Sequence, residues 1–145
     1  MSWAEFVENK IINFTTDEGH KFMNACKDGG IYGLDGTKWS TSSGLTLSEN
    51  EVKALVSFFT NHSAVSLCLG GNKYQVTCDN KDTNSVYLKI GGGGACVAKT
   101  NKAIIVGIYD TTKTTTIDNK EKSQNVGYCN SAVENLQQYL IGIGY

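Results

Sequence analysis

The chain of 145 residues contains no proline. It cannot form a polyproline segment of its own, and its turns must depend on sixteen glycines, which tolerate the backbone angles that turns require. No apolar run approaches the roughly 20 residues of a transmembrane helix. The formal net charge is −1, so no overall basic character indicates nucleic acid or a membrane surface as the main partner. These absences indicate a soluble protein.

Features of exported or multidomain proteins are missing as well. Glu5 and Glu8 interrupt the N-terminal region, which lacks the basic and then apolar layout of a signal peptide. No linker or internal repeat divides the chain, and its length suits a single domain with a substantial core. We therefore expect one cytoplasmic domain that covers residues 1–145 and acts as a monomer.

Motifs for catalysis and metal binding are scarce. The two histidines, His20 and His62, lie far apart in sequence, and the five cysteines include no C-x-x-C pair. The glycine run at residues 91–94 leads into a strand pattern, not into the Gly-Lys-Ser/Thr of a phosphate-binding loop. No Gly-x-Ser-x-Gly motif is present. We expect reduced structural thiols, no metal, no cofactor and no enzyme activity.

Capping boxes and apolar stripes predict three helices. Residues 2–5, Ser-Trp-Ala-Glu, form one capping box and open an N-terminal helix. Residues 48–51, Ser-Glu-Asn-Glu, form a second box before a shorter amphipathic helix. Residues 129–145 carry apolar side chains at spacings of three and four, which predicts a C-terminal helix that covers a sheet.

The remaining hydrophobic pattern predicts an antiparallel sheet. The dipeptide Asp35-Gly36 is a strong hairpin signal between the strand candidates 30–34 and 37–41. From residue 65 onwards apolar and polar residues alternate, and short turns divide the pattern into five strands. Residues 15–29 predict an irregular connection, and residues 110–127 predict an exposed, mobile loop.

The order of these elements predicts an α+β fold. We expect a central antiparallel sheet of about six to seven strands. The N- and C-terminal helices should pack together on one face of this sheet and the shorter helix on the other.

Aromatic residues concentrate in the predicted terminal helices and the first hairpin: Trp3, Phe6, Trp39, Tyr139 and Tyr145. If the two terminal helices lie side by side, these rings can converge into a shallow groove. Such a groove suits a polyproline II ligand, because that stiff helix has little conformational entropy left to lose. Trp N–H and Tyr O–H groups can donate to the free carbonyls of the ligand.

The hairpin, the central strands and both terminal helices contain specific motifs: SWAEFVEN at 2–9, DGTKWS at 35–40, LGGNKY at 69–74, KTNKA at 99–103, GIYD at 107–110, CN at 129–130, VENL at 133–136 and YLIG at 139–142. In these motifs the chain resembles profilin along almost its whole length, and the central strands are especially similar to those of plant profilins. Phe6 stands where the family commonly has a tyrosine.

The resemblance implies a protein that regulates actin polymerisation and does no covalent chemistry. It implies binding of monomeric actin, of proline-rich proteins such as formins and, weakly, of phosphoinositide lipids, with two separate sites that allow bridging of the protein ligands. The implied polyproline site consists of Trp3, Phe6, Asn9, Trp39, Tyr139, Leu140 and Tyr145. The implied actin site consists of Lys73, Val76, Lys89, Gly127, Asn130 and Asn135.

Two other classes of function remain as alternatives. One is a small-ligand or phosphoinositide-responsive sensor domain of similar α/β shape, with a pocket under the sheet. The other is a thiol enzyme that uses Cys26 near His20, which requires a depressed pKa of that cysteine.

Overall fold

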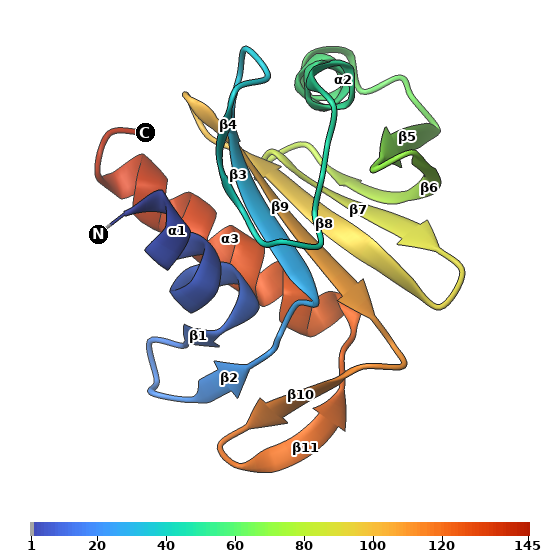
Figure 1. Cartoon of the computed structure of the whole chain (residues 1–145). Helices are drawn as coiled ribbons and strands as arrows, with labels where there is room; N and C mark the ends of the chain where they lie inside the picture. The colour runs from blue at the N-terminus through green and yellow to red at the C-terminus, as the bar shows by residue number, and fades with distance from the viewer. Residues whose placement is uncertain (1) are drawn as a thin grey trace.

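The main sheet of the computed structural model, which describes residues 2–145, contains seven antiparallel strands (Figure 1). Their order is β4-β3-β9-β8-β7-β6-β5, so β3 of the first hairpin pairs with β9, the last strand of the meander. The strands are β3 (Asp28–Gly33), β4 (Lys38–Thr41), β5 (Ser66–Leu69), β6 (Asn72–Asn80), β7 (Ser85–Ile90), β8 (Gly93–Lys99) and β9 (Ala103–Asp110).

Helices cover both faces of this sheet (Figure 1). On one face, α1 (Trp3–Phe6) continues into the π-helix η1 (Val7–Ile12), which packs against α3 (Val126–Gly142). The other face carries α2 (Glu49–Asn61). The predicted α+β class and placement of the helices are confirmed. Among residues 2–145, no helix is long and apolar enough to cross a membrane.

Two hydrophobic clusters fill the space on the two sides of the sheet. Ile11 of η1 and Leu136 of α3 are buried together with Ile105 of β9. Leu55 of α2 is buried with Val106, the next residue of β9, because successive strand residues point to opposite faces. Burial of each such side chain contributes about 1.5–3 kcal/mol, so both helical layers are held by apolar packing.

The N-terminus of α2 is joined to the β5–β6 turn by one carboxylate. Ser48 and Glu51 form the predicted capping box, with the Glu51 backbone N–H donating to Ser48 Oγ at 3.1 Å. Glu51 also accepts hydrogen bonds from the backbone N–H groups of Gly70 at 3.1 Å and Gly71 at 2.8 Å. Both glycines have positive φ, 61° and 82°, which side-chain-bearing residues rarely adopt.

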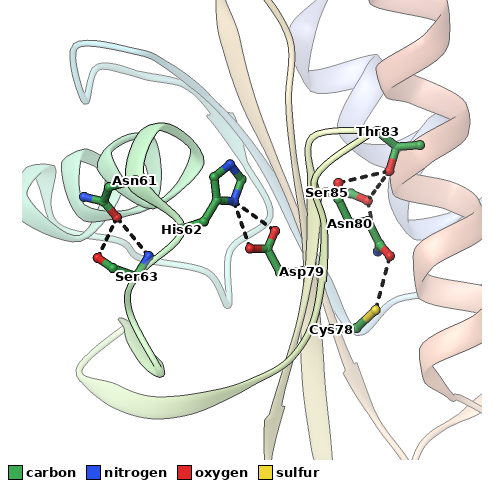
Figure 2. A network of polar contacts seen from close by, with 8 residues as sticks. All are labelled: Asn61, His62, Ser63, Cys78, Asp79, Asn80, Thr83 and Ser85. Atoms are coloured by element: carbon green, nitrogen blue, oxygen red, sulfur yellow. Dashed lines mark hydrogen bonds and ion pairs between the residues drawn. The ribbon is translucent and has the colours of Figure 1, made fainter.

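Polar side chains tie the β6–β7 region to α2 and to α3, and Figure 2 draws the contact with α2 and the residues around Ser85. His62, the C-cap of α2, places Nδ1 2.9 and 3.0 Å from the two carboxylate oxygens of Asp79 on β6. On the other side, Ser85 Oγ of β7 donates to Glu134 of α3 at 2.7 Å. Beside the first contact, the backbone N–H and hydroxyl of Ser63 donate to Asn61. Hydrogen bonds of 3.0–3.3 Å extend the second contact from Ser85 to Thr83, Asn80 and Cys78.

A second sheet of four short strands lies below the main sheet in Figure 1. Its order is β1-β2-β10-β11, formed by β1 (Phe14–Thr15), β2 (Lys21–Met23), β10 (Thr114–Ile117) and β11 (Lys120–Ser123). The predictions of an irregular connection at 15–29 and of a loop at 110–127 are therefore wrong, whereas residues 111–114 and 118–123 are exposed as expected. Each strand is too short and too polar to show an alternation, and the decisive β2–β10 pairing joins distant parts of the chain.

A local signal for the hairpin of this second sheet was present in the sequence. Asp118 and Asn119 both have positive φ, 48° and 68°, as a two-residue type I′ turn requires. They follow the β-branched residues of β10, which favour a strand. The predicted C-terminal helix also begins earlier than expected, at Val126, where Asn125 caps it by accepting the N–H of Tyr128.

Candidate functional site

Side chains from both ends of the chain meet in a cluster of five aromatic rings, here called the aromatic ledge: Trp3, Phe6, Trp39, Tyr139 and Tyr145. The ring centroid of Trp3 lies 4.6 Å from that of Trp39 and 5.2 Å from that of Tyr145. On the other side, Phe6 lies 5.5 Å from Trp3 and 5.8 Å from Tyr139. The convergence of these rings, which the sequence could only suggest, is confirmed.

Local backbone structure holds both termini at the ledge. Ser2 caps α1 through its hydroxyl oxygen and so fixes Trp3 in the first turn. After α3, Gly144 has a φ of 97°, and the Tyr145 N–H donates to the Leu140 carbonyl at 2.9 Å. The last residue is thereby turned back towards the N-terminal tryptophan.

A glycine in β3 makes room for the second tryptophan. A Cβ atom at Gly33 would lie 3.0 Å from Trp39 Nε1 on the neighbouring strand β4, closer than ordinary packing allows. The indole of Trp39 can therefore lie close to the sheet edge while its ring contacts Trp3 and Tyr145. The first hairpin thus supplies one of the two indoles of the ledge.

Two lysines flank the ledge and were not selected by the sequence analysis. Lys10 Nζ of η1 lies 5.6 Å from the ring centroid of Tyr139, and Lys102 Nζ lies 5.4 Å from that of Tyr145. Both distances suit cation–π contacts, which restrict the orientation of the two tyrosine rings. Of the two, only Lys10 could have been selected from the sequence, because it follows Phe6 by one turn of the predicted N-terminal helix.

The expected polyproline residues divide into exposed and supporting groups. Tyr139 is 47% exposed, and Asn9 lies exposed on η1. Phe6 is only 6% exposed and Leu140 is fully buried, so these two side chains support the ledge from below. The remaining three rings are partly buried: Trp3, Trp39 and Tyr145. The ledge therefore offers one exposed and three partly exposed rings with Trp N–H and Tyr O–H groups, a surface suited to an extended apolar ligand with free carbonyls.

The expected actin residues on the sheet do not all share one face. Gln75 pairs with Lys89, so Lys73, two residues before Gln75, points to the same face as Lys89. Tyr87 shows which face this is, because it packs against the α3-side core. Val76 instead packs against the α2-side core, so its side chain lies on the opposite face from the two lysines.

The expected actin residues on α3 lie in its first half and middle. Gly127 and Asn135 are exposed, whereas Asn130 is partly buried and its Oδ1 atom is buried without a hydrogen-bond partner. Asn130 and Asn135 line a cavity of about 410 Å³ together with Thr16 and Glu18 from the chain that follows β1. The structure thus brings α3 next to a segment that the sequence analysis had not connected with it.

The cysteines are free thiols with unequal exposure. Cys26, Cys96 and Cys129 are buried between α3 and the main sheet, while Cys68 is exposed on the edge strand β5. Contact with the Cys129 thiol and burial raise the pKa of Cys26. A reactive thiolate needs the opposite shift, and His20 pairs with Asp118 on the second sheet, so the geometry gives no support to a Cys26–His20 enzyme.

The fold and the ledge together define a small α+β binding domain whose surface is assembled from both chain termini. The family model described as Profilin matches residues 1–145, and the chain belongs to the profilin family. It is 33% identical to Profilin-1B of Acanthamoeba castellanii over 148 aligned residues, with 100% of both chains covered.

Solved structures agree with this assignment. The structure of Acanthamoeba castellanii profilin IB has a TM-score of 0.78 to this chain at 28% identity, covering 99% of this chain and 100% of the other. Mouse profilin IIa, solved in complex with a double repeat from the FH1 domain of mDia1, has a TM-score of 0.64 at 19% identity, with 100% of both chains covered. LokiProfilin2, solved with rabbit actin, has a TM-score of 0.62 at 12% identity, covering 82% and 87%. The last two likenesses concern the fold alone.

Proposed function

We propose that this member of the profilin family is a cytoplasmic adaptor of the actin cytoskeleton. It binds monomeric actin on one surface and proline-rich segments of actin regulators, such as formins, on the aromatic ledge. It regulates polymerisation by holding monomers and by being recruited to proline-rich partners, and it catalyses no covalent step. Weak phosphoinositide binding stays a prediction.

The observation that carries this proposal is the meeting of Trp3 and Tyr145 at 5.2 Å between ring centroids. A polyproline II ligand has no internal hydrogen bonds, so its carbonyls can accept from the donors of the ledge. Its rings can lie flat on the aromatic faces, with little loss of conformational entropy. Phe6 lacks the hydroxyl that a tyrosine would offer, so we expect about 0.5–1.5 kcal/mol less binding energy than with a donor there.

Support for an actin surface comes from the two exposed lysines of β6 and β7. Lys73 and Lys89 point to the face of the main sheet that carries α3. This surface lies apart from the aromatic ledge at the other end of α3, so both ligands can bind at once. Val76 lies on the opposite face and contributes to this surface only through its backbone.

The polyproline site is tested by titrating decaproline and following tryptophan fluorescence. Tyr139→Ala removes an exposed ring of the ledge and should weaken binding by roughly 1 kcal/mol or more, as expected for an aromatic contact at a binding surface. Tyr128→Ala is the matched control, because this tyrosine of α3 packs on Phe22 outside the ledge. Equal affinity of both variants, or no fluorescence change in the unaltered protein, would contradict the site.

The actin surface is tested by polymerisation of pure actin with increasing amounts of this protein. The unaltered protein should reduce spontaneous assembly, and Lys73→Glu combined with Lys89→Glu should remove most of this effect by charge reversal. Lys81→Glu changes an exposed lysine in the β6–β7 turn and serves as the control. If the control loses as much activity as the double variant, net charge rather than this surface explains the effect.

The sensor-domain alternative has less support. It requires a ligand pocket under the main sheet, but buried apolar side chains pack against both faces there. It also leaves the convergence of the terminal rings without a role.

A further inference from the structure

The second sheet carries a cavity of about 440 Å³ that none of the proposed profilin sites uses. Phe22 of β2 and Ile117 of β10 contribute its apolar surface. Lys120 and Lys122 of β11 line one side, and His20 and Asp118 line another. This volume lies within the range of roughly 300–1,000 Å³ that is typical of small-molecule sites.

The apolar surface of this cavity is held in place by stacking. Phe22 stacks on Phe14 with ring centroids 4.5 Å apart and an interplanar angle of 19°, and its edge contacts Tyr128 of α3 at 5.4 Å. Ile117 is the strand partner of Phe22, so both side chains point to the same face of the sheet. An apolar surface is therefore already formed before a ligand arrives.

The acidic side of the cavity is held by contacts within the protein. Asp118 accepts from the Lys21 backbone N–H at 2.9 Å, and His20 Nδ1 lies 2.7 Å from its other carboxylate oxygen. The hydrogen bond and the charge of Asp118 raise the pKa of His20, and Glu18 lies 3.7 Å from His20 Nε2. Both carboxylate oxygens of Asp118 thus have partners within the protein, which leaves the lysine side as the open polar side of the cavity.

The lysine side is different, because its charges have no partners. Lys120 pairs with Ile117 and Lys122 with Thr115 across the β10–β11 hairpin, so the two side chains share the face that carries the cavity. Within residues 2–145, neither ammonium group lies in an ion pair with a carboxylate. An apolar surface beside two unpaired cations is complementary to a ligand with an apolar body and a negative head.

We propose that this cavity binds a small amphipathic anion, with its apolar body on Phe22 and Ile117 and its carboxylate or phosphate head between Lys120 and Lys122. None of its lining residues belongs to the aromatic ledge, and it shares Thr16 and Glu18 with the cavity that Asn130 and Asn135 line. The same chemistry is offered by a free aliphatic acid and by an acidic lipid, and the two sources can be separated.

The test uses three probes with the same eight-carbon chain: octanoate, octan-1-ol and octyltrimethylammonium. Octanoate should cause saturable shifts of the backbone amide NMR signals of Phe22, Ile117 and Lys120. Octan-1-ol should bind more weakly and the cation least. Lys120→Gln combined with Lys122→Gln should weaken octanoate binding about three- to tenfold, since two partly exposed charge contacts are lost.

The control variant is Lys38→Gln combined with Lys81→Gln, which changes the net charge equally at exposed positions outside the cavity. Equal weakening in both double variants would overturn the proposal, as would octanoate shifts centred on the aromatic ledge or equal affinity for octan-1-ol. Thermal unfolding of each variant verifies that the fold is kept.

Sedimentation with phosphatidylcholine vesicles, with and without phosphatidic acid, identifies the source. Binding to the acidic vesicles that is lost in the Lys120/Lys122 variant assigns the site to an acidic lipid. Octanoate binding without vesicle binding assigns it to a free acid. Failure of both probes overturns the proposal, and it does so without affecting the polyproline or actin assays.

Discussion

At the scale of single residues, neighbouring positions of α3 have separate tasks. Tyr139 is 47% exposed and contributes its ring to the aromatic ledge, while Leu140, the next residue, is fully buried under α1 and η1. The helical rotation of about 100° per residue makes this division unavoidable, because adjacent side chains cannot face the same way. Substitutions of Tyr139 and Leu140 can therefore separate an effect on ligand binding from an effect on the stability of the fold.

We predict losses of stability of unequal size for two adjacent substitutions. Leu140→Ala should lower the free energy of unfolding by about 2–5 kcal/mol, because it leaves a cavity in the α3-side core. Tyr139→Ala should lower it by much less, about 1 kcal/mol or below, as expected at a half-exposed position. Urea unfolding followed by circular dichroism measures both values. Similar losses in the two variants would show that the exposed tyrosine belongs to the core.

At the scale of elements, α2 is held by polar contacts at both of its ends. Its N-terminus is joined to the β5–β6 turn through Glu51, and its C-cap His62 is joined to β6 through Asp79. Both contacts reach the same edge of the main sheet, where β5 is the last strand. These contacts stabilise the sheet at its edge strand β5, which pairs with a single neighbouring strand, β6.

We predict that Glu51→Ala lowers the free energy of unfolding by about 1–2 kcal/mol, since the capping box and two turn N–H groups lose their acceptor. Protection of the Gly70 and Gly71 amides from hydrogen exchange should fall with it. Glu49→Ala is the control, because Glu49 forms a surface ion pair with Lys53 at 2.7 Å, worth about 0–1 kcal/mol. A larger loss for Glu49→Ala than for Glu51→Ala would refute the role of the turn contact.

At the scale of the whole molecule, the packing of α3 on the main sheet decides the accessibility of the thiols. Cys26 precedes β3, Cys96 belongs to β8 and Cys129 to α3, yet all three are buried in one core. Gly107 of β9 leaves room for two of them, because a Cβ there would lie 3.0 Å from Cys129 Sγ and 3.1 Å from Cys26 Sγ. Cys68 lies outside this core.

We predict that iodoacetamide alkylates Cys68 rapidly in the folded protein and Cys78 more slowly. The three core thiols should react only as fast as the protein unfolds, because reagent cannot enter a close-packed interior. Mass spectrometry of alkylated peptides, with a guanidinium-treated sample as reference, gives the rates. Cys68→Ser should remove the fast phase alone. Alkylation of Cys26 at the rate of Cys68 would contradict the packing described above.

Much of the fold could be predicted because its signals are local. Ser48 and Glu51 lie three residues apart and form the expected capping box, and Asp35-Gly36 joins the expected hairpin. The alternation after residue 65 gave the meander because each of its strands pairs with the next along the chain. For these elements, the errors of the prediction were limited to boundaries, such as the earlier start of α3.

The second sheet could not be predicted in the same way, and neither could the placement of the expected actin residues on two faces of the main sheet. Phe22 and Ile117 are strand partners although most of the chain lies between them in sequence. Neither short strand has an alternation that reveals a partner. The separation of Val76 from Lys73 and Lys89 depends on which core each sheet face carries. The Asp118-Asn119 turn was a usable signal for the hairpin alone, not for its pairing with β2.

The amino-acid sequence alone determined the helices, the meander and the family resemblance, because caps, turns and periodicity act over a few residues. The tertiary structure decided that Trp3 and Tyr145 touch, that three cysteines share one core, and that Phe22 and Ile117 form one apolar surface beside two lysines. These contacts arise only when distant segments are packed together, since the free energy that selects them comes from burial in the complete fold.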